Sequence, residues 1–103
     1  MEYNIKLSKE AEEDIDEIIG YIINVLKNPI AANKLLTEIE ANYSILSHAP
    51  DSFAYCEDQR LRILGYRKIP VKNYIIFYKV DNESETVYIL RVIYGRREYT
   101  NLI

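Results

Sequence analysis

The chain has 103 residues, 49% of them hydrophobic and 28% charged, which fits one domain spanning residues 1–103 with a single core. Its one cysteine, Cys56, and its one histidine, His48, exclude an internal disulfide and the usual zinc sites, so neither a metal nor a cofactor is expected. The apolar stretches are too short to cross a bilayer and the acidic N-terminus has no signal-peptide core, so we expect a cytoplasmic protein that engages no membrane.

The net charge of −3 is distributed unevenly along the chain. Residues 1–58 carry a net charge of −8, and residues 59–103 carry a net charge of +5. The acidic residues have two readings, a solvated helix face or a binding surface. The cations of the second half fall partly in two short groups, and this grouping favours a binding role for them.

The first elements are a short strand and a helix. Tyr3, Ile5 and Leu7 alternate with polar residues, which predicts a strand with one buried face. Ser8 is a suitable N-cap, and acidic residues follow in the first turns, where they suit the helix dipole. Apolar residues then recur at helical spacing and predict a helix over Lys9–Lys27: Ala11, Ile15, Ile18, Ile22 and Leu26.

A second helix follows directly. Asn28 can cap it, Pro29 suits its first position, and the helix is expected to run to about Ser47. Its apolar stripe consists of Ala32, Leu35, Leu36, Ile39, Tyr43 and Leu46. Because the connection is so short, the two helices must fold back on each other as an antiparallel hairpin.

The second half predicts three strands. Residues 51–59 are polar and read as a loop, and Arg60–Val71 reads as a strand with a kink near Gly65. The core residues expected in that strand are Leu61, Ile63, Tyr66 and Ile69. Asn73–Val80 and Thr86–Tyr94 are rich in Ile, Val and Tyr and flank a short acidic break, which predicts a β-hairpin.

The predicted order is therefore β-α-α-β-β-β. The fold class expected from it is α+β, with the helical hairpin packed on one face of a mainly antiparallel four-stranded sheet.

This order, with the segments NPIAANKLL, NYIIFYKVD and LRVIYGRREY, resembles the RelE/ParE superfamily, the toxins of bacterial type II toxin–antitoxin modules. The resemblance covers nearly the whole chain. It implies a growth-inhibiting protein held inactive by a cognate antitoxin. The exposed strand edges could pair with the antitoxin or with a second copy of the chain, which leaves a toxin–antitoxin hetero-oligomer and a homodimer as alternatives. RelE-like members cleave mRNA in the ribosomal A site, whereas ParE-like members poison DNA gyrase, and the fold alone does not decide between them.

RelE-like sites cleave RNA mainly with Lys, Arg and Tyr, and the correspondence here is partial. Lys68 and Arg97 resemble basic residues of such a site, and Tyr99 could replace a C-terminal tyrosine, although it comes several residues early. Ile75 stands where RelE-like strands carry an arginine facing the scissile phosphate. Loss of such a donor typically costs about 3 kcal/mol in the transition state. Arg91 can supply the charge of the missing arginine only if its side chain faces the same side of the sheet as Ile75.

The same cations could instead bind phosphate or the acidic residues of an antitoxin. The candidates for this role are Arg67, Lys72, Arg91, Arg96 and Arg97. We assign no catalytic role to His48, at the end of the second helix, or to Cys56, in a loop with no adjacent base. Asp14 and Glu17 have helix-surface spacing and read as part of a solvated face.

Three functional hypotheses follow from these residues. The first is ParE-like inhibition of DNA gyrase, favoured by Ile75, by the low pI of about 5.2 and by the long helical hairpin. The second is a RelE-like, metal-independent mRNA endoribonuclease acting on the ribosome, favoured by Lys68 and the C-terminal cations. The third is a relic that binds its antitoxin without being toxic.

Overall fold

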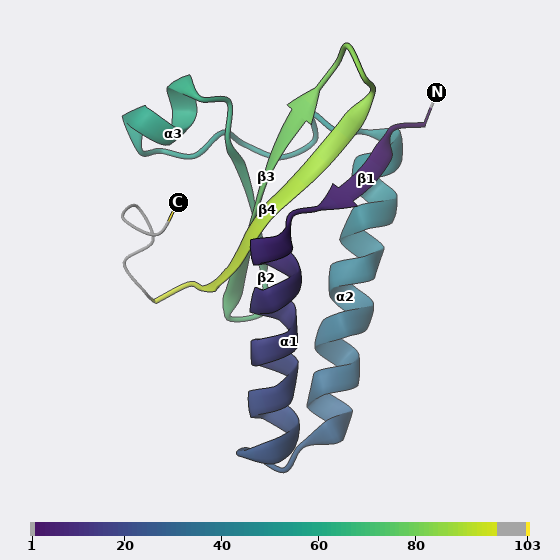
Figure 1. Ribbon diagram of the computed structural model, residues 1–103, viewed down its shortest axis with the longest axis vertical. Helices are drawn as coiled ribbons and strands as arrows, with labels where there is room; N and C mark the ends of the chain where they lie inside the picture. The colour runs from purple at the N-terminus through teal and green to yellow at the C-terminus, as the bar shows by residue number, and fades with distance from the viewer. Residues whose placement is uncertain (1, 97–102) are drawn as a thin grey trace.

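The computed structural model describes residues 2–96 and Ile103. The chain forms two long helices, one short helix and a four-stranded sheet, and their arrangement is drawn in Figure 1. In chain order the elements are β1 (Asn4–Leu7), α1 (Lys9–Asn24), α2 (Pro29–His48), α3 (Gln59–Ile63), β2 (Arg67–Val71), β3 (Tyr74–Asp81) and β4 (Thr86–Tyr94). The strand order in the sheet is β1-β4-β3-β2, with β1 parallel to β4 and the other pairs antiparallel. The predicted α+β architecture is confirmed.

Side-chain caps fix where the two long helices begin. Ser8 accepts a hydrogen bond from the Ala11 amide (3.0 Å) and donates to the Leu90 carbonyl (2.8 Å), which ties the start of α1 to β4. Asn28 caps α2 by accepting from the Ala31 amide, with Pro29 at the first helical position. Both helix starts therefore lie where the sequence predicts them.

The helix α1 ends at Asn24, three residues before the predicted end at Lys27. Lys27 has a φ of 54°, in the left-handed region, and the Asn28 amide donates back to the Ile22 carbonyl (3.0 Å). This left-handed residue ends α1 and turns the chain into α2. The hairpin that results projects beyond the sheet in Figure 1.

The main core lies between this helical hairpin and one face of the sheet. Buried side chains from all layers form it: Ala11, Ile22, Ala32, Leu35, Ile39, Leu46, Ile69, Val71, Ile76, Tyr78, Val87, Ile89 and Val92. The Tyr78 hydroxyl is satisfied by the Pro50 carbonyl (2.9 Å). At about 25 cal/mol per Å² of buried apolar surface, this packing is the dominant stabilising contribution to the fold.

The prediction of one strand over Arg60–Val71 is wrong. Residues 59–63 form the helix α3, capped by Asp58, whose carboxylate accepts from the Leu61 amide (3.0 Å). Leu61 is buried, but Ile63 is 76% exposed and is not a core residue. Gly65, with a φ of 86°, separates the helix from the strand, which starts at Arg67.

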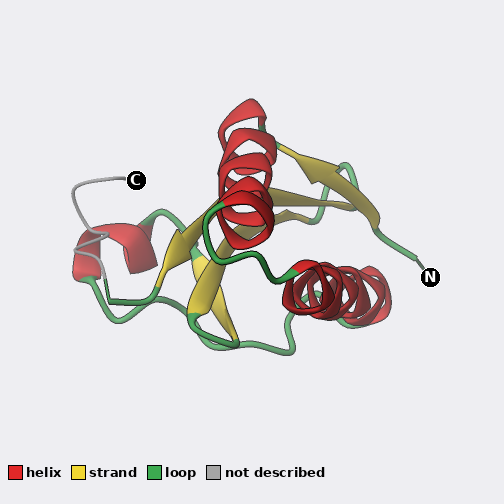
Figure 2. Ribbon diagram, turned by 90° about the horizontal axis from the view of Figure 1, so that it is seen from below, coloured by secondary structure: helices red, strands yellow, loops and turns green. Residues whose placement is uncertain are grey.

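A second, smaller cluster covers the other face of the sheet. Cys56, Leu61, Phe77 and Ile93 are buried there, and the flanking residues Tyr66, Ile75 and Ile103 pack against them. Figure 2 shows α3, which contributes to this cluster, on the opposite side of the molecule from α2. The sheet is therefore covered on one face by the helical hairpin and on the other by the α3 region, while α1 also runs along the edge of β4, where Asp14 accepts from the Val92 amide.

The strands β3 and β4 pair with one irregularity. Phe77 pairs with Arg91 and Tyr78 with Ile89, so Leu90 has no partner in the register. An extra residue of this kind is a β-bulge, which increases local twist and re-aims the neighbouring side chains. The bulge lies directly beside Arg91, one of the candidate site residues.

Candidate functional site

Two candidate cations flank Phe77 on the sheet face that carries the second cluster. Lys68 of β2 and Arg91 of β4 are both cross-strand partners of Phe77, on either side of it. By the register, Arg91 shares this face with Ile75, as the sequence analysis required for it to compensate for the missing arginine. The chemistry available here depends on what holds the two cations.

Arg91 is held by a carboxylate of α1. Its Nε donates to Asp14 Oδ2 (2.7 Å) and its second guanidinium nitrogen to Asp14 Oδ1 (3.0 Å), a bidentate pair. The Val92 amide also donates to Asp14 (2.9 Å), and both charged side chains are largely buried. Hydrogen bonding to Asp14 raises the pKa of Arg91 above its ordinary value. The reading of Asp14 as part of a solvated face is wrong, because it fastens α1 to β4.

Lys68 lies beside the carboxylate of Glu57. Its amine is 3.9 Å from Glu57, and its side chain is 26% exposed. Cys56 is fully buried next to it, and burial raises the pKa of the thiol despite the opposing charge of Lys68. A buried thiol with a raised pKa is a poor nucleophile at neutral pH. This arrangement offers a cation for contact with an anion and no activated cysteine.

Arg67 is the most buried of the candidate cations that the structure describes. Its guanidinium donates to the Phe53 carbonyl (2.6 Å), stands 3.9 Å from the centre of the Tyr55 ring and lies 3.6 Å from Asp51. Its side chain is only 13% exposed. These contacts place Arg67 as a clamp between β2 and the preceding loop.

Lys72 and Arg96 lie at the end of the sheet from which the helical hairpin projects. The Gly95 amide donates to the Asn73 carbonyl (2.8 Å), which brings the residue after β4 against the β2–β3 turn. Lys72 has a φ of 56° in that turn, and its half-exposed amine pairs with Glu38 of α2 (3.2 Å). Arg96 is exposed. The two residues form a basic end of the sheet, separate from the two cations beside Phe77.

Ile75 packs against the second cluster and contacts the region of Gly95. The remaining catalytic candidates, Arg97 and Tyr99, lie outside the described residues. His48 is in the last turn of α2 and its ring is 3.2 Å from Glu2, on an exposed surface. Among residues 2–96 and 103, no group of three or more His, Cys, Asp or Glu could hold a metal ion. None of the helices in this part of the chain is long and apolar enough to span a bilayer.

Comparison with family models identifies the chain. Residues 5–99 match the model of the ParE toxin of the type II toxin–antitoxin system parDE. The chain belongs to this family. The match covers both long helices and, except for Asn4, all four strands of this ParE-family chain. A comparison with curated proteins found no match.

Solved structures of toxins share the fold of this ParE-family chain. The chromosomal ParDE system of P. aeruginosa is 20% identical, with a TM-score of 0.70 over 89% of this chain and 95% of that one. The RelBE2 complex of Mycobacterium tuberculosis is 20% identical, with a TM-score of 0.62 over 91% and 99%. A mutant of E. coli RelE in the free state is 15% identical, with a TM-score of 0.65 over 99% and 90%. Both toxin types share this fold, so these likenesses do not separate ParE from RelE.

Several residues that shape the site carry little signal in the sequence. Asp14 and Glu57 are carboxylates among many, and their pairing with Arg91 and Lys68 joins distant segments. Tyr55 is one of ten tyrosines, and only the fold brings it over Arg67. The alternation of strand residues does predict that Lys68 and Phe77 share a face, provided the register is known.

Proposed function

We propose that this chain is a toxin that acts on DNA gyrase and is kept inactive by a cognate antitoxin. The observation that carries the proposal is which side chains lie on the sheet face around Phe77 and what they contact. Lys68 and Arg91 each lie beside a carboxylate, and Ile75 stands where a RelE-like site needs an arginine. Phosphoryl transfer to a 2′-hydroxyl needs donors preorganised at the developing negative charge. The described part of this face offers instead an apolar cluster, a guanidinium held by the Asp14 carboxylate, and one lysine near an exposed carboxylate.

Two further observations support gyrase as the target. The family model that matches residues 5–99 is that of a ParE toxin, and the resemblance implies a gyrase target for ParE-like members. The net charge of −3 disfavours binding within ribosomal RNA, because affinity for a phosphate backbone depends on the cations that neutralise it.

An antitoxin partner is supported by the neighbours in fold. Solved neighbours include the RelBE2 complex of M. tuberculosis, the archaeal RelE–RelB complex and the E. coli RelBE complex, each a toxin with its antitoxin. In this chain, the exposed cations at the end of the sheet, Lys72 and Arg96, are the candidates for contact with acidic residues of such a partner.

A RelE-like ribonuclease is the second candidate, and Lys68 favours it. Its amine lies 3.9 Å from a Glu57 carboxylate that is 90% exposed, so substrate phosphate could displace that weak pair. Arg97 and Tyr99 would have to supply the remaining groups. On this reading Lys68→Ala and Arg97→Ala abolish RNA cleavage and leave antitoxin binding intact.

Inducible expression in a bacterial host, with and without the antitoxin, tests the proposal. We expect growth arrest, relaxation of a reporter plasmid on a chloroquine gel, and no new 5′ ends in mRNA by primer extension. The variants Lys68→Ala and Arg97→Ala should remain toxic. Growth arrest with A-site cleavage ends and normal supercoiling would establish the ribonuclease. Normal growth with retained antitoxin binding would identify a non-toxic relic.

A further inference from the structure

A pocket of about 300 Å³ opens between α1 and α2, beside the end of β1. The two helices run side by side in Figure 1 and contact each other. The apolar lining of the pocket comes from three elements, with Leu7 from β1, Ile15 from α1, and Leu36 and Ile39 from α2. Ile39 is buried and the other three side chains are half-buried, so they form an apolar floor. An aliphatic chain can lie on this floor without removing a polar group from water.

Three carboxylates surround the apolar floor. Glu12 and Asp16 come from α1 and Glu40 comes from α2, and all three side chains are exposed. Glu12 and Asp16 are four residues apart and therefore neighbours on one helix face, where like charges repel. None of the ion pairs within the described residues involves these three carboxylates. No described lysine, arginine or histidine lines the pocket, so its negative charge is uncompensated.

Tyr43 adds an aromatic ring and a hydroxyl without a partner. The ring lines the pocket and is half-buried, and none of the described residues forms a hydrogen bond with its buried hydroxyl. Burial, and to a lesser degree the carboxylate of Glu40, raises the pKa of this phenol to about 12, so it stays neutral at physiological pH. A neutral phenol accepts a hydrogen bond from an ammonium group, and the face of its ring attracts a cation.

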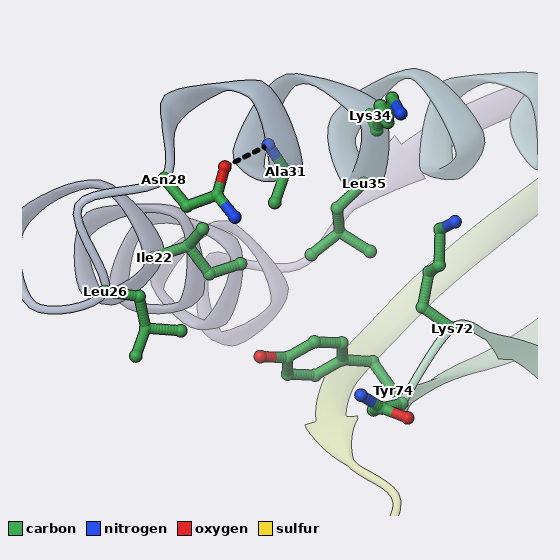
Figure 3. A pocket seen from close by; sticks show the side chains of 9 residues that line it. Ile22, Leu26, Asn28, Ala31, Lys34, Leu35, Lys72 and Tyr74 are labelled. Carbon is green, nitrogen blue, oxygen red and sulfur yellow. Dashed lines mark hydrogen bonds between the residues drawn. The ribbon is translucent and has the colours of Figure 1, made fainter.

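The pocket between the end of the helical hairpin and the sheet has the opposite polar lining. Figure 3 shows Lys34 and Lys72 around it, together with the apolar side chain of Leu35 and the ring of Tyr74. No described aspartate or glutamate lines it, and the two pockets share no residue. A cation should therefore distinguish the two pockets and enter the one between α1 and α2.

We propose that the pocket between α1 and α2 binds a linear aliphatic polyamine, a chain of methylene groups that ends in ammonium groups. The methylene groups lie on the apolar floor. One ammonium group lies between the carboxylate of Glu40 and the ring of Tyr43, and a small rotation of this ring lets the hydroxyl accept a hydrogen bond from it. The other ammonium group lies at Glu12 and Asp16, so the ligand bridges the two helices.

Two simpler cations fit the pocket less well. A metal ion gains nothing from the apolar floor, and the described residues include no group of three or more His, Cys, Asp or Glu that could hold one. A monoamine would leave the carboxylates of one helix unpaired. The pocket shares no residue with the sheet face around Phe77, so the inference does not depend on whether gyrase or the ribosome is the target.

The test is a titration of the purified protein with spermidine and putrescine, followed by calorimetry and by amide chemical shifts at low ionic strength, where charges are least screened. Butylamine and Mg²⁺ are the control ligands. We expect spermidine to reach half-saturation at about 0.1 mM and to shift the amide signals of Leu36 and Tyr43. We expect putrescine to bind about threefold more weakly than spermidine, and butylamine at least about tenfold more weakly.

Variants locate the binding site. Glu12→Gln and Glu40→Gln change exposed side chains, so they should fold, and each should weaken spermidine binding about fivefold. Glu13→Gln removes the same charge from an exposed position of α1 that does not line the pocket, and it should leave the affinity within about twofold. Tyr43→Phe keeps the ring and should weaken binding about threefold while making the protein more stable, an opposite pair of effects that a loss of structure cannot produce.

Three results would overturn the proposal. One is the absence of spermidine binding at about 5 mM. Another is an equal loss of affinity in Glu13→Gln and Glu40→Gln, which would reduce the effect to general attraction by an acidic helix. The third is binding of butylamine or Mg²⁺ as tight as that of spermidine, which would mean that the pocket does not recognise a chain with several ammonium groups.

Discussion

The pair formed by Asp14 and Arg91 should be the most sensitive polar contact in the described part of the chain. The Asp14 carboxylate accepts two hydrogen bonds from the guanidinium and a third from the Val92 amide, at 2.7–3.0 Å. Asp14→Ala leaves a largely buried guanidinium without this carboxylate and removes the acceptor of a backbone N–H. Breaking one side of a buried pair costs about 3–5 kcal/mol.

The exposure of the pair sets the expected size of the effect. The Asp14 side chain is 15% exposed and that of Arg91 is 23% exposed, so water partly compensates the loss, and the lower end of the range applies. We expect Asp14→Ala to lower the free energy of unfolding by about 3 kcal/mol, and Asp14→Asn by about half of that, because its carbonyl can still accept from Val92.

Urea unfolding followed by circular dichroism measures these changes. Glu13→Ala, an exposed neighbour on α1, is the control and should lie within about 0.5 kcal/mol of wild type. A double-mutant cycle with Arg91→Met should give a coupling of about 2 kcal/mol. If Asp14→Ala matched Glu13→Ala, the claim that this carboxylate fastens α1 to β4 would be refuted.

Three further predictions use matched pairs or a pH series. Tyr43→Phe should stabilise the protein by about 1 kcal/mol, because no described residue forms a hydrogen bond with its buried hydroxyl. Tyr78→Phe should destabilise it by about 1 kcal/mol, because the Pro50 carbonyl loses its hydrogen-bond donor. Urea unfolding measures both changes in stability, and equal changes in the two variants would contradict this assignment. Burial raises the pKa of both phenols from 10.0 to about 12, so the stability they confer is complete below pH 10 and should be lost as the pH rises from 10 to 12, with a shallower loss in Tyr43→Phe. Gly65→Ala should lower the stability by about 1–2 kcal/mol because φ is 86°; the new methyl group meets nothing closer than 3.8 Å, so the cost comes from the backbone conformation and not from a clash. Gly20→Ala, inside α1, should raise the stability by about 1 kcal/mol. Thermal melts that shift in the same direction for both variants would refute the conformational argument.

The helical hairpin was predictable because its signals are local. Ser8 and Asn28 cap the helices, Pro29 starts the second, and the apolar stripes have helical spacing. The strands β3 and β4 were equally predictable from their β-branched and aromatic residues. The end of α1 was placed too late, because Val25, Leu26 and Lys27 continue the helical composition although Lys27 leaves the helical conformation.

The segment before β2 shows where local patterns fail. Leu61 and Ile63 alternate with arginines, which is the pattern of a strand, yet residues 59–63 are helical. The helix depends on the cap by Asp58 and on the burial of Leu61 against Phe77, a contact between segments far apart in the chain. Tertiary packing therefore overrides the alternation.

The candidate site was predictable in part. The positions of Lys68 and Arg91 beside one buried residue follow from strand pairing, but the bulge at Leu90 and the capture of Arg91 by Asp14 do not. The pocket between the end of the helical hairpin and the sheet is lined by residues of α1, α2 and the β2–β3 turn, so no single stretch of the sequence predicts it.

The central claim is that the toxin acts on DNA topology. The most direct measurement adds the purified protein to DNA gyrase, relaxed plasmid and ATP and follows supercoiling on an agarose gel. The account predicts that supercoiling falls in proportion to the protein added and that Lys68→Ala inhibits as well as wild type. Unchanged supercoiling at excess protein, together with cleavage of ribosome-bound mRNA by the same preparation, would contradict it.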